Sequence, residues 1–278
     1  MNQFTVWRAV ERFFIEFFGF LFNNMSQCYL VVASVFPYSY TLLYCIFNTN
    51  LSFKNHFKIL VNRLKPLMDM LLTPYQNAFI QDRNITDNIL LVHEICDTLR
   101  KKKGRKKGYG TLKIDISKAY DRINWNFLKV VLLSMNFGTT LVNWIMKCVS
   151  TIQYSLLVNG SHSKPFHPSR GIRQGDPISP YLFLFCANTL SLALTKEENQ
   201  KNLKGVKIGR NGFSFTHILF AEDSFIFFQN DNRSLTALKK TILWYCSLFG
   251  QSINFNKSEL FCSLNIDPDI QDSLASSL

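Results

Sequence analysis

Hydrophobic residues recur at two spacings along the chain, and each spacing predicts a different kind of element. Between Asn55 and Leu72 they recur three to four positions apart, as on one face of a helix, and Pro66 interrupts the run. Residues 85–100 repeat this helical spacing. Residues 110–117 alternate instead, with apolar residues on one face and Asp115 on the other. This part of the chain therefore predicts two helical segments followed by a strand.

The rest of the pattern predicts helices and paired strands in a mixed order. Helices are expected over residues 118–138, 140–150, 177–197 and 234–250, and strands over residues 154–160, 205–209, 213–220, 224–230 and, in two short pieces, 252–263. The segments 213–220 and 224–230 pair naturally across a tight turn. Strands that return as hairpins, with helices packed on them, predict an α+β fold rather than a doubly wound one.

The charge of the chain points to a polyanionic partner. The net charge is +12 and the isoelectric point is near 9.4, which favours nucleic acid first and an acidic membrane second. Much of the excess lies in one run: Arg100, Lys101, Lys102, Lys103, Arg105, Lys106 and Lys107. This run reads either as a nucleic-acid-binding loop that contacts phosphates or as a solvated loop or localisation signal.

Cysteine usage and the first 54 residues bear on the location of the protein. The seven Cys residues are dispersed, which favours reduced thiols in an intracellular protein, nuclear or cytoplasmic, over disulfides or a zinc site. Residues 1–54 form an apolar, aromatic leader without charge between Glu16 and Lys54. Its run 28–47 has the length of a membrane span, but polar residues in its middle make membrane association the lesser alternative.

Two adjacent carboxylates, Glu222 and Asp223, interrupt the apolar stretch HILFAEDSFIFF. They are either ordinary turn residues or functional groups held at the end of two buried strands. Asp115 sits at the end of another apolar strand, so one sheet can bring the three together. Such crowding needs a cation, and oxygen ligands without His or Cys suit Mg²⁺. Two Mg²⁺ ions in a basic chain suggest nucleotidyl transfer.

A glycine-containing turn, GIRQGDP, precedes the helix expected over residues 177–197. Gly171 and Gly175 allow the backbone to approach a ligand closely, and Pro177 fixes the entry into the helix. The alternative interpretation is a plain junction between a loop and a helix.

Four motifs in order, KIDISKAYDR, SRGIRQGDPISPYLF, HILFAEDS and FGQSINFNKS, resemble the successive palm motifs of reverse transcriptases, most closely those of plant LINE-type retrotransposons. The resemblance covers Asn55 to Ser263. It implies a right-hand polymerase palm over residues 111–263, partial fingers over 55–110, a tail over 264–278 and a thumb that is largely missing. The activity it implies is RNA-directed DNA polymerisation on a primed RNA template, from dNTPs, with two Mg²⁺ ions or Mn²⁺ in their place.

The resemblance also implies roles for individual residues. Asp115, Glu222 and Asp223 match the metal ligands, and Lys257 matches a lysine that donates a proton to the leaving pyrophosphate. Tyr120 matches the ring that excludes a 2′-hydroxyl, and Asp121 orients the same turn. Along the template and the nascent base pair lie Arg173, Gln174, Gly175 and Asp176.

Four departures from the family pattern predict weakened activity. Glu222 stands where the family has Asp, and a displacement near 1 Å costs roughly 10²-fold in rate. The basic fingers hairpin is expected to have no counterpart between Arg12 and Lys54, and the endonuclease domain of full-length LINE proteins is expected to be missing. Asp82 replaces a glycine in the turn-like segment TPYQNAFIQDRNITDN (residues 73–88), which predicts strain in that turn. The chain is therefore expected to be either an impaired, truncated polymerase or a catalytically inactive nucleic-acid-binding remnant.

Overall fold

The computed structural model describes residues 53–101, 108–159, 161–208, 213–267, 269–271 and 274. The helices are α4 (Phe53–Leu64), the 3-10 helix η1 (Lys65–Leu67), α5 (Met68–Leu71), α6 (Ile85–Lys101), α7 (Trp125–Ser134), α8 (Thr139–Ser150), α9 (Ser179–Asn199) and α10 (Asn232–Phe249). The strands are β1 (Tyr109–Ile114), β2 (Leu157–Val158), β3 (Ser161–His162), β4 (Val206–Lys207), β5 (Ser214–Phe215), β6 (His217–Phe220), β7 (Asp223–Gln229) and β8 (Glu259–Cys262). The predictions for residues 1–52, with the run 28–47, and for Lys102–Lys107 lie outside the described residues.

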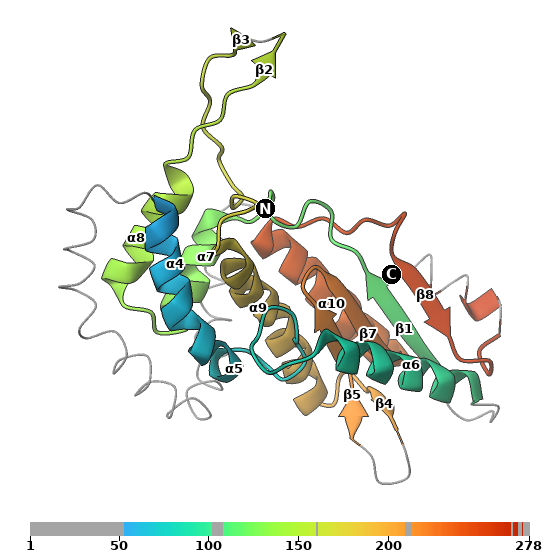
Figure 1. The fold of residues 1–278 in the computed structure, drawn as a ribbon. Coiled ribbons are helices and arrows are strands. Elements are labelled where there is room, and N and C mark those ends of the chain that lie inside the picture. The colour runs from blue at the N-terminus through green and yellow to red at the C-terminus, as the bar shows by residue number, and fades with distance from the viewer. Residues whose placement is uncertain are drawn as a thin grey trace.

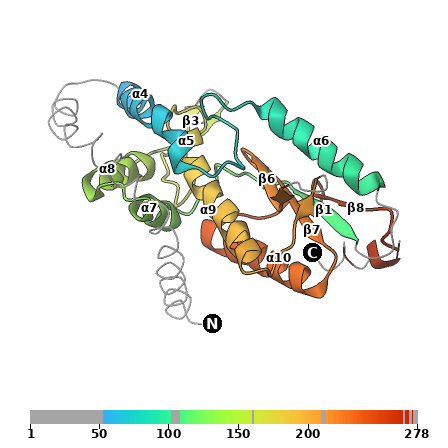
Figure 2. The ribbon, with the colours of Figure 1, turned by 90° about the horizontal axis from the view of Figure 1, so that it is seen from below.

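The main sheet has four antiparallel strands in the order β6-β7-β1-β8, of which β7, β1 and β8 are labelled in Figure 1 and β6 in Figure 2. β1 is an inner strand, in which Ile114 pairs with Ser224 of β7 and Lys113 pairs with Glu259 of β8. The hairpin expected from residues 213–220 and 224–230 is confirmed as β6 and β7, which pair up to Phe220 and Asp223. Antiparallel pairing with packed helices confirms the predicted α+β class.

Helices cover both faces of this sheet, which lies between α6 and α10 in Figure 2. On one face Ile114 and Phe228 join a large core with α7, α9 and α10. On the other face Phe227 packs with Ile95 and Leu99 of α6. Gly110 is required in β1 because a Cβ atom there would lie 2.5 Å from the ring of Phe228.

Helix α9 is the central helix of the larger core. Its consecutive residues Phe183, Leu184 and Phe185 are all buried, so the helix is enclosed on every side rather than amphipathic. Leu64 and Met68, from the segment before the sheet, belong to the same core. The helix predicted over residues 177–197 is therefore confirmed, and Pro180 lies in its first turn as expected.

The helix predicted over residues 118–138 begins later, at Trp125. The preceding residues form turns, in which the N–H groups of Asp121 and Arg122 donate to the carbonyl of Lys118 at 3.0 and 3.2 Å. Asn124 then caps α7, since its side-chain oxygen accepts from the N–H groups of Asn126 and Phe127 at 2.9 and 3.3 Å. The chain after β1 is thus a loop, which leaves Tyr120 outside any helix.

Two further features differ from a packed palm sheet. The strand predicted over residues 154–160 is reduced to β2, which pairs only with β3 in a ribbon that projects from the body (Figure 1). In the strand region 252–263 the structure has β8 and a single bridge between Ile116 and Ile253. None of the described helices is both long and apolar enough to cross a membrane.

Candidate functional site

Asp115 follows the last residue of β1, and its backbone is held on the side of β8. Its N–H donates to Oγ of Ser258 at 3.2 Å, and its carbonyl accepts from the N–H of Asn254 at 2.9 Å. On the other side the pairing of β1 with β7 ends at Ile114 and Ser224. Asp115 follows Ile114, and Asp223 precedes Ser224. The two carboxylates therefore lie at the same end of the sheet.

The turn between β6 and β7 consists of Ala221 and Glu222. Ala221 has φ +49°, in the left-handed region that costs a residue with a Cβ about 1–2 kcal/mol. Such a conformation persists only where surrounding contacts fix it. The contacts come from a segment far earlier in the chain.

Residues 75–88 brace this turn. The carbonyl of Tyr75 accepts from the N–H of Leu219 at 2.8 Å, and the side-chain oxygen of Gln76 accepts from the N–H groups of Ala78 and Ala221 at 3.0 and 3.2 Å. Asn88 donates to the carbonyl of Leu219 at 3.2 Å. The sequence marked this segment only as turn-like. It gave no signal for Gln76, because the contact joins residues 145 positions apart. Asp82, in the same segment, has φ +64°, as its replacement of a glycine predicted.

A buried polar chain fixes the start of β6. Nε2 of His217 is hydrogen-bonded to Oγ of Ser191 in α9 at 2.6 Å, and its Nδ1 lies 3.0 Å from Oγ1 of Thr216. The hydroxyl of Thr216 donates to Glu198, so it accepts from a protonated Nδ1 and leaves Nε2 as an acceptor. Burial lowers the pKa of His217 to about 3, which keeps the ring neutral.

Tyr120 and Glu222 approach each other across the site. The Tyr120 ring stacks on Phe183 of α9, with centroids 5.1 Å apart. Burial raises the pKa of the Tyr120 hydroxyl, and the nearby negative charge of Glu222 raises it further. The Glu222 carboxylate is thus near Tyr120, while its side chain is exposed at the turn.

The GIRQGDP turn packs against the loop that carries Tyr120. The N–H of Ile172 donates to the Tyr120 carbonyl at 2.9 Å, and a Cβ at Gly171 would lie 2.6 Å from the Asp121 carbonyl oxygen. Gly171 is therefore the glycine at which the backbone of this turn approaches another part of the protein closely. Gly175 has φ +90° and open space where a Cβ would stand, so its conformation requires glycine and leaves room for a ligand.

The exposed side chains predicted to bind substrate lie around this loop. Gln174 donates to the Asp121 carboxylate at 3.4 Å, and Arg173 is exposed beside it. Asp176 is buried at the start of α9. Lys257 is exposed in the turn that also holds the Asp115 carbonyl, where its N–H donates to the carbonyl of Asn254 at 3.1 Å. Of the basic run, Arg100 and Lys101 form the exposed end of α6.

The three carboxylates expected to bind metal do not form a complete metal site. Within the described ranges, no three His, Cys, Asp or Glu side chains lie close enough to hold a metal ion. Asp115 and Asp223 lie at the same end of the sheet, beside the last pair of β1 and β7, and Glu222 lies in the adjoining turn. These carboxylates offer hard oxygen donors, which fit Mg²⁺ in kind.

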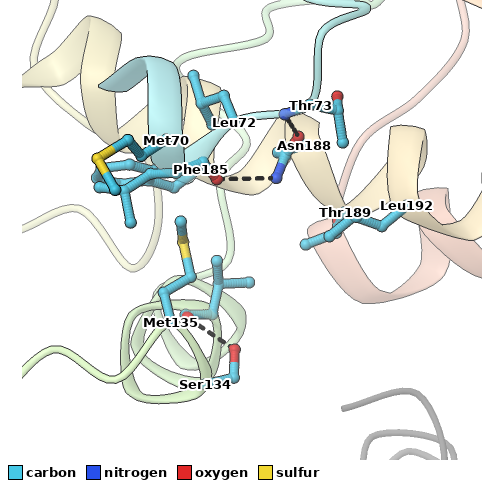
Figure 3. Close-up of a pocket in the computed structure, with 11 residues that line it drawn as sticks. Met70, Leu72, Thr73, Ser134, Met135, Phe185, Asn188, Thr189 and Leu192 are labelled. Atoms are coloured by element: carbon cyan, nitrogen blue, oxygen red, sulfur yellow. Dashed lines mark hydrogen bonds between the residues drawn. The ribbon is translucent and has the colours of Figure 1, made fainter. Parts of the chain in front are cut away.

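An apolar cavity of about 170 Å³ lies elsewhere, between α5, α7 and α9 (Figure 3). Met70, Met135 and Phe185 line it, together with Asn188. The Asn188 amide is already engaged, since its oxygen accepts from the N–H of Thr73 at 3.0 Å and its nitrogen donates to the carbonyl of Leu71 at 3.5 Å. No titratable side chain lines this cavity, so the candidate chemistry lies with the carboxylates.

Solved telomerase structures have a similar fold. The apo telomerase of Candida tropicalis without its C-terminal domain has a TM-score of 0.51 and 13% identity, and covers 76% of this chain and 40% of its own. The telomerase of the same organism with a fragment of telomeric RNA also has a TM-score of 0.51. At this identity the likeness concerns the fold alone. It confirms the predicted α+β palm with packed helices.

The model of the reverse transcriptase (RNA-dependent DNA polymerase) family matches residues 45–273, and the chain belongs to this family. It is 26% identical over 184 residues to the Pol polyprotein of the retrotransposable element R2DM of Drosophila melanogaster, and 41% identical over 68 residues to an uncharacterized mitochondrial protein of Arabidopsis thaliana. These matches cover 66% and 24% of this chain. The chain spans 16% and 56% of the lengths of these relatives. The predicted reverse transcriptase domain of a LINE-type element is confirmed.

Proposed function

We propose that this chain extends a DNA primer on an RNA template from dNTPs. The observation that carries the proposal is the placement of Asp115 and Asp223 at the same end of the palm sheet, beside the last pair of β1 and β7 and inside the residues that match the family. The charge of +12 suits an RNA–DNA hybrid as the partner. The loop of Tyr120 and the open space at Gly175 leave room beside the carboxylates for a nucleotide.

Asp115, Asp223 and Glu222 would hold two Mg²⁺ ions, or Mn²⁺, through carboxylate oxygens. When bound, two such ions activate an attacking hydroxyl and stabilise the charge of a leaving pyrophosphate. Glu222 is the weakest of the three ligands, because it is one methylene longer than the family's Asp and lies near Tyr120. We therefore expect slow turnover rather than none.

The remaining residues bind and orient the reactants. The Tyr120 ring, held by Phe183, blocks the space of a ribose 2′-hydroxyl and so favours deoxynucleotides. Arg173, Gln174 and Gly175 lie along the template and the nascent base pair. Lys257 donates a proton to the pyrophosphate as the new bond forms.

Primer extension on poly(rA) with an oligo(dT) primer, dTTP and Mg²⁺ tests the proposal. We expect slow extension by the natural chain, a rise on the order of 10²-fold in E222D, and no extension in D115N. E259D is the matched control, since Glu259 is exposed in β8 and the change removes the same methylene. Equal extension by D115N and the natural chain would refute the assignment.

A second function is supported by the spacing of the candidate ligands, since no three acidic, His or Cys side chains of the described residues lie close enough to hold an ion. In this alternative the chain binds RNA or RNA–DNA hybrid without catalysis, through the palm and the basic run. It predicts no extension by the natural chain or by E222D, with hybrid binding that weakens as salt rises. Replacing Lys101–Lys103 and Arg105–Lys107 by Gln should then reduce binding, and unchanged binding would exclude this role for the run.

A further inference from the structure

The ribbon formed by residues 153–167 has no packing partner of its own. Among its described residues, most hydrogen bonds join one arm to the other, including the pair between Tyr154 and Phe166 at 2.9 and 2.8 Å and that from Ser163 to Leu156 at 2.8 Å, and none reaches the body of the protein. An isolated two-stranded ribbon is at best marginally stable in water. A second surface that covers the ribbon would stabilise it.

The ribbon nevertheless exposes large apolar side chains. Leu157 is 65% exposed and Val158 is 58% exposed, on the only pair of strands in the ribbon. Leu156, Tyr154 and Phe166 are exposed as well. A group of exposed apolar residues marks an interaction site more often than a free surface. The exposed side chains of the ribbon therefore favour an interaction surface.

The charge around the ribbon selects the partner. No Asp or Glu lies between Asp121 and Asp176, a stretch that includes α7, α8 and the whole ribbon. The same stretch carries Arg122, Lys129, Lys147, Lys164, Arg170 and Arg173. A second copy would bring the same positive charge, so self-association through this face is opposed. A polyanion is favoured instead.

The base of the ribbon leads directly into the candidate site. Gly171 follows its returning arm, and the N–H of Gly171 donates to the carbonyl of Ile123 at 2.8 Å, beside the loop of Tyr120. The ribbon projects from the body (Figure 1), and its returning arm runs into the GIRQGDP turn beside the loop of Tyr120. A nucleic acid therefore fits this position better than an acidic membrane does.

We propose that the β2–β3 ribbon lies edge-on along the shallow groove of an RNA–DNA hybrid, with Lys164 and Arg170 on phosphates and with Leu157 on one face of the ribbon and Val158 on the other, each against sugars. This inference rests on the proposed function and assigns a contact surface to its partner. A-form duplexes have a wide, shallow minor groove that presents sugar edges, and their major groove is too deep and narrow for side chains. An arm of about seven residues spans roughly 23 Å, the length of about seven base pairs.

Binding of a fluorescently labelled RNA–DNA hybrid to the full chain, without dNTP, tests the proposal. We expect K164Q/R170Q to weaken binding on the order of 10- to 100-fold at 0.1 M salt and to reduce the slope of log Kd against log salt by about 2. L157S/V158T should weaken binding several-fold with the slope unchanged. Shortening the hybrid by about seven base pairs should abolish the difference between these variants and the natural chain.

Matched controls change the same charge or the same exposed apolar area elsewhere. K207Q/K240Q removes two exposed cations from β4 and α10, and F213S removes an exposed aromatic ring near β5. If ribbon and control variants bind equally, the proposal is wrong. It is also wrong if the ribbon variants lose only self-association or binding to phosphatidylserine vesicles. Because binding needs no turnover, a chain that fails primer extension but shows the ribbon effect refutes catalysis and keeps this inference.

Discussion

Two hairpins in the described part of the chain have opposite surroundings. β6 and β7 lie between helices, with Phe227 and Ile226 buried, and their turn is held by Gln76. β2 and β3 stand apart from the body, with Leu157 exposed. Each hairpin contains a residue with φ +49°, Ala221 in the first and Asn159 in the second. Ala221, for which this backbone conformation is strained, lies in the densely packed hairpin. Asn159, which tolerates the conformation, lies in the hairpin without packing against the body.

This difference shows that tertiary contacts, rather than strand pairing, fix the geometry of the candidate site. In the buried hairpin a residue that disfavours the left-handed region is held there by contacts from a distant segment. In the projecting ribbon the local sequence has to suffice, and Asn adopts the left-handed region more readily. Matched substitutions in the two hairpins therefore test the contrast.

The largest effect is expected at the core of the buried hairpin. F227A removes a fully buried ring and should lower the free energy of unfolding by about 3–5 kcal/mol. L157A in the ribbon should change it by less than about 0.5 kcal/mol. Urea unfolding followed by circular dichroism measures both. Similar losses in the two variants would mean that the ribbon packs on the body.

The next effect is a dependence of stability on pH that comes from His217. Its pKa is about 3 in the folded chain and near 6.5 when unfolded, so only the unfolded state gains the proton between these values. Stability is highest above pH 6.5 and falls as the pH drops, by about 2 kcal/mol at pH 5. Urea unfolding at several pH values should show this slope, H217Q should remove it, and H162Q in the ribbon should retain it.

The brace at the turn should contribute less. Q76L keeps the size of the side chain but removes the acceptor for the N–H groups of Ala78 and Ala221, at a cost of about 1–3 kcal/mol. Q153L changes an exposed Gln in the ribbon and should cost under about 0.5 kcal/mol. Thermal unfolding of both variants compares them. Equal melting temperatures would mean that the turn does not depend on Gln76.

The smallest effect is expected at the two left-handed residues. A221G should raise the free energy of unfolding by about 1 kcal/mol, because glycine adopts φ +49° without a Cβ penalty. N159G should change it by less than about 0.5 kcal/mol, since Asn tolerates this region. A destabilised A221G would contradict the assignment of strain to Ala221. The same unfolding measurement decides it.

The sequence predicted the elements that local patterns control. Alternation found β1, the apolar runs around Glu222 found β6 and β7, and Gly250 marked the end of α10 with φ +79°. Local patterns misplaced the start of α7, because apolar residues before Trp125 continued the helical spacing although Asn124 caps the helix there. At this end of the helix, the capping residue decides where the helix begins, and the spacing of apolar residues does not.

The candidate site was predictable in its residues and less so in its arrangement. Asp115 and Asp223 lie at the same end of the sheet, as strands of one sheet allowed, whereas the position of Glu222 depends on a turn held by Gln76. No spacing rule links residues so distant. The roles proposed for Arg173, Gln174 and Lys257, and the domain boundaries at residues 54, 110 and 263, stay predictions.

The β6–β7 turn is held by two side chains from an earlier segment: Gln76 accepts from the N–H of Ala221, and Asn88 donates to the carbonyl of Leu219. These hydrogen bonds determine the smallest fragment that can preserve the turn. A recombinant palm beginning at Gly108 would contain the three candidate metal ligands. The N–H groups of Leu219 and Ala221 would nevertheless lose their acceptors, the carbonyl of Tyr75 and the side-chain oxygen of Gln76. A fragment made for expression should therefore begin upstream of Thr73. The first reverse transcriptase motif begins only about forty residues later, in β1.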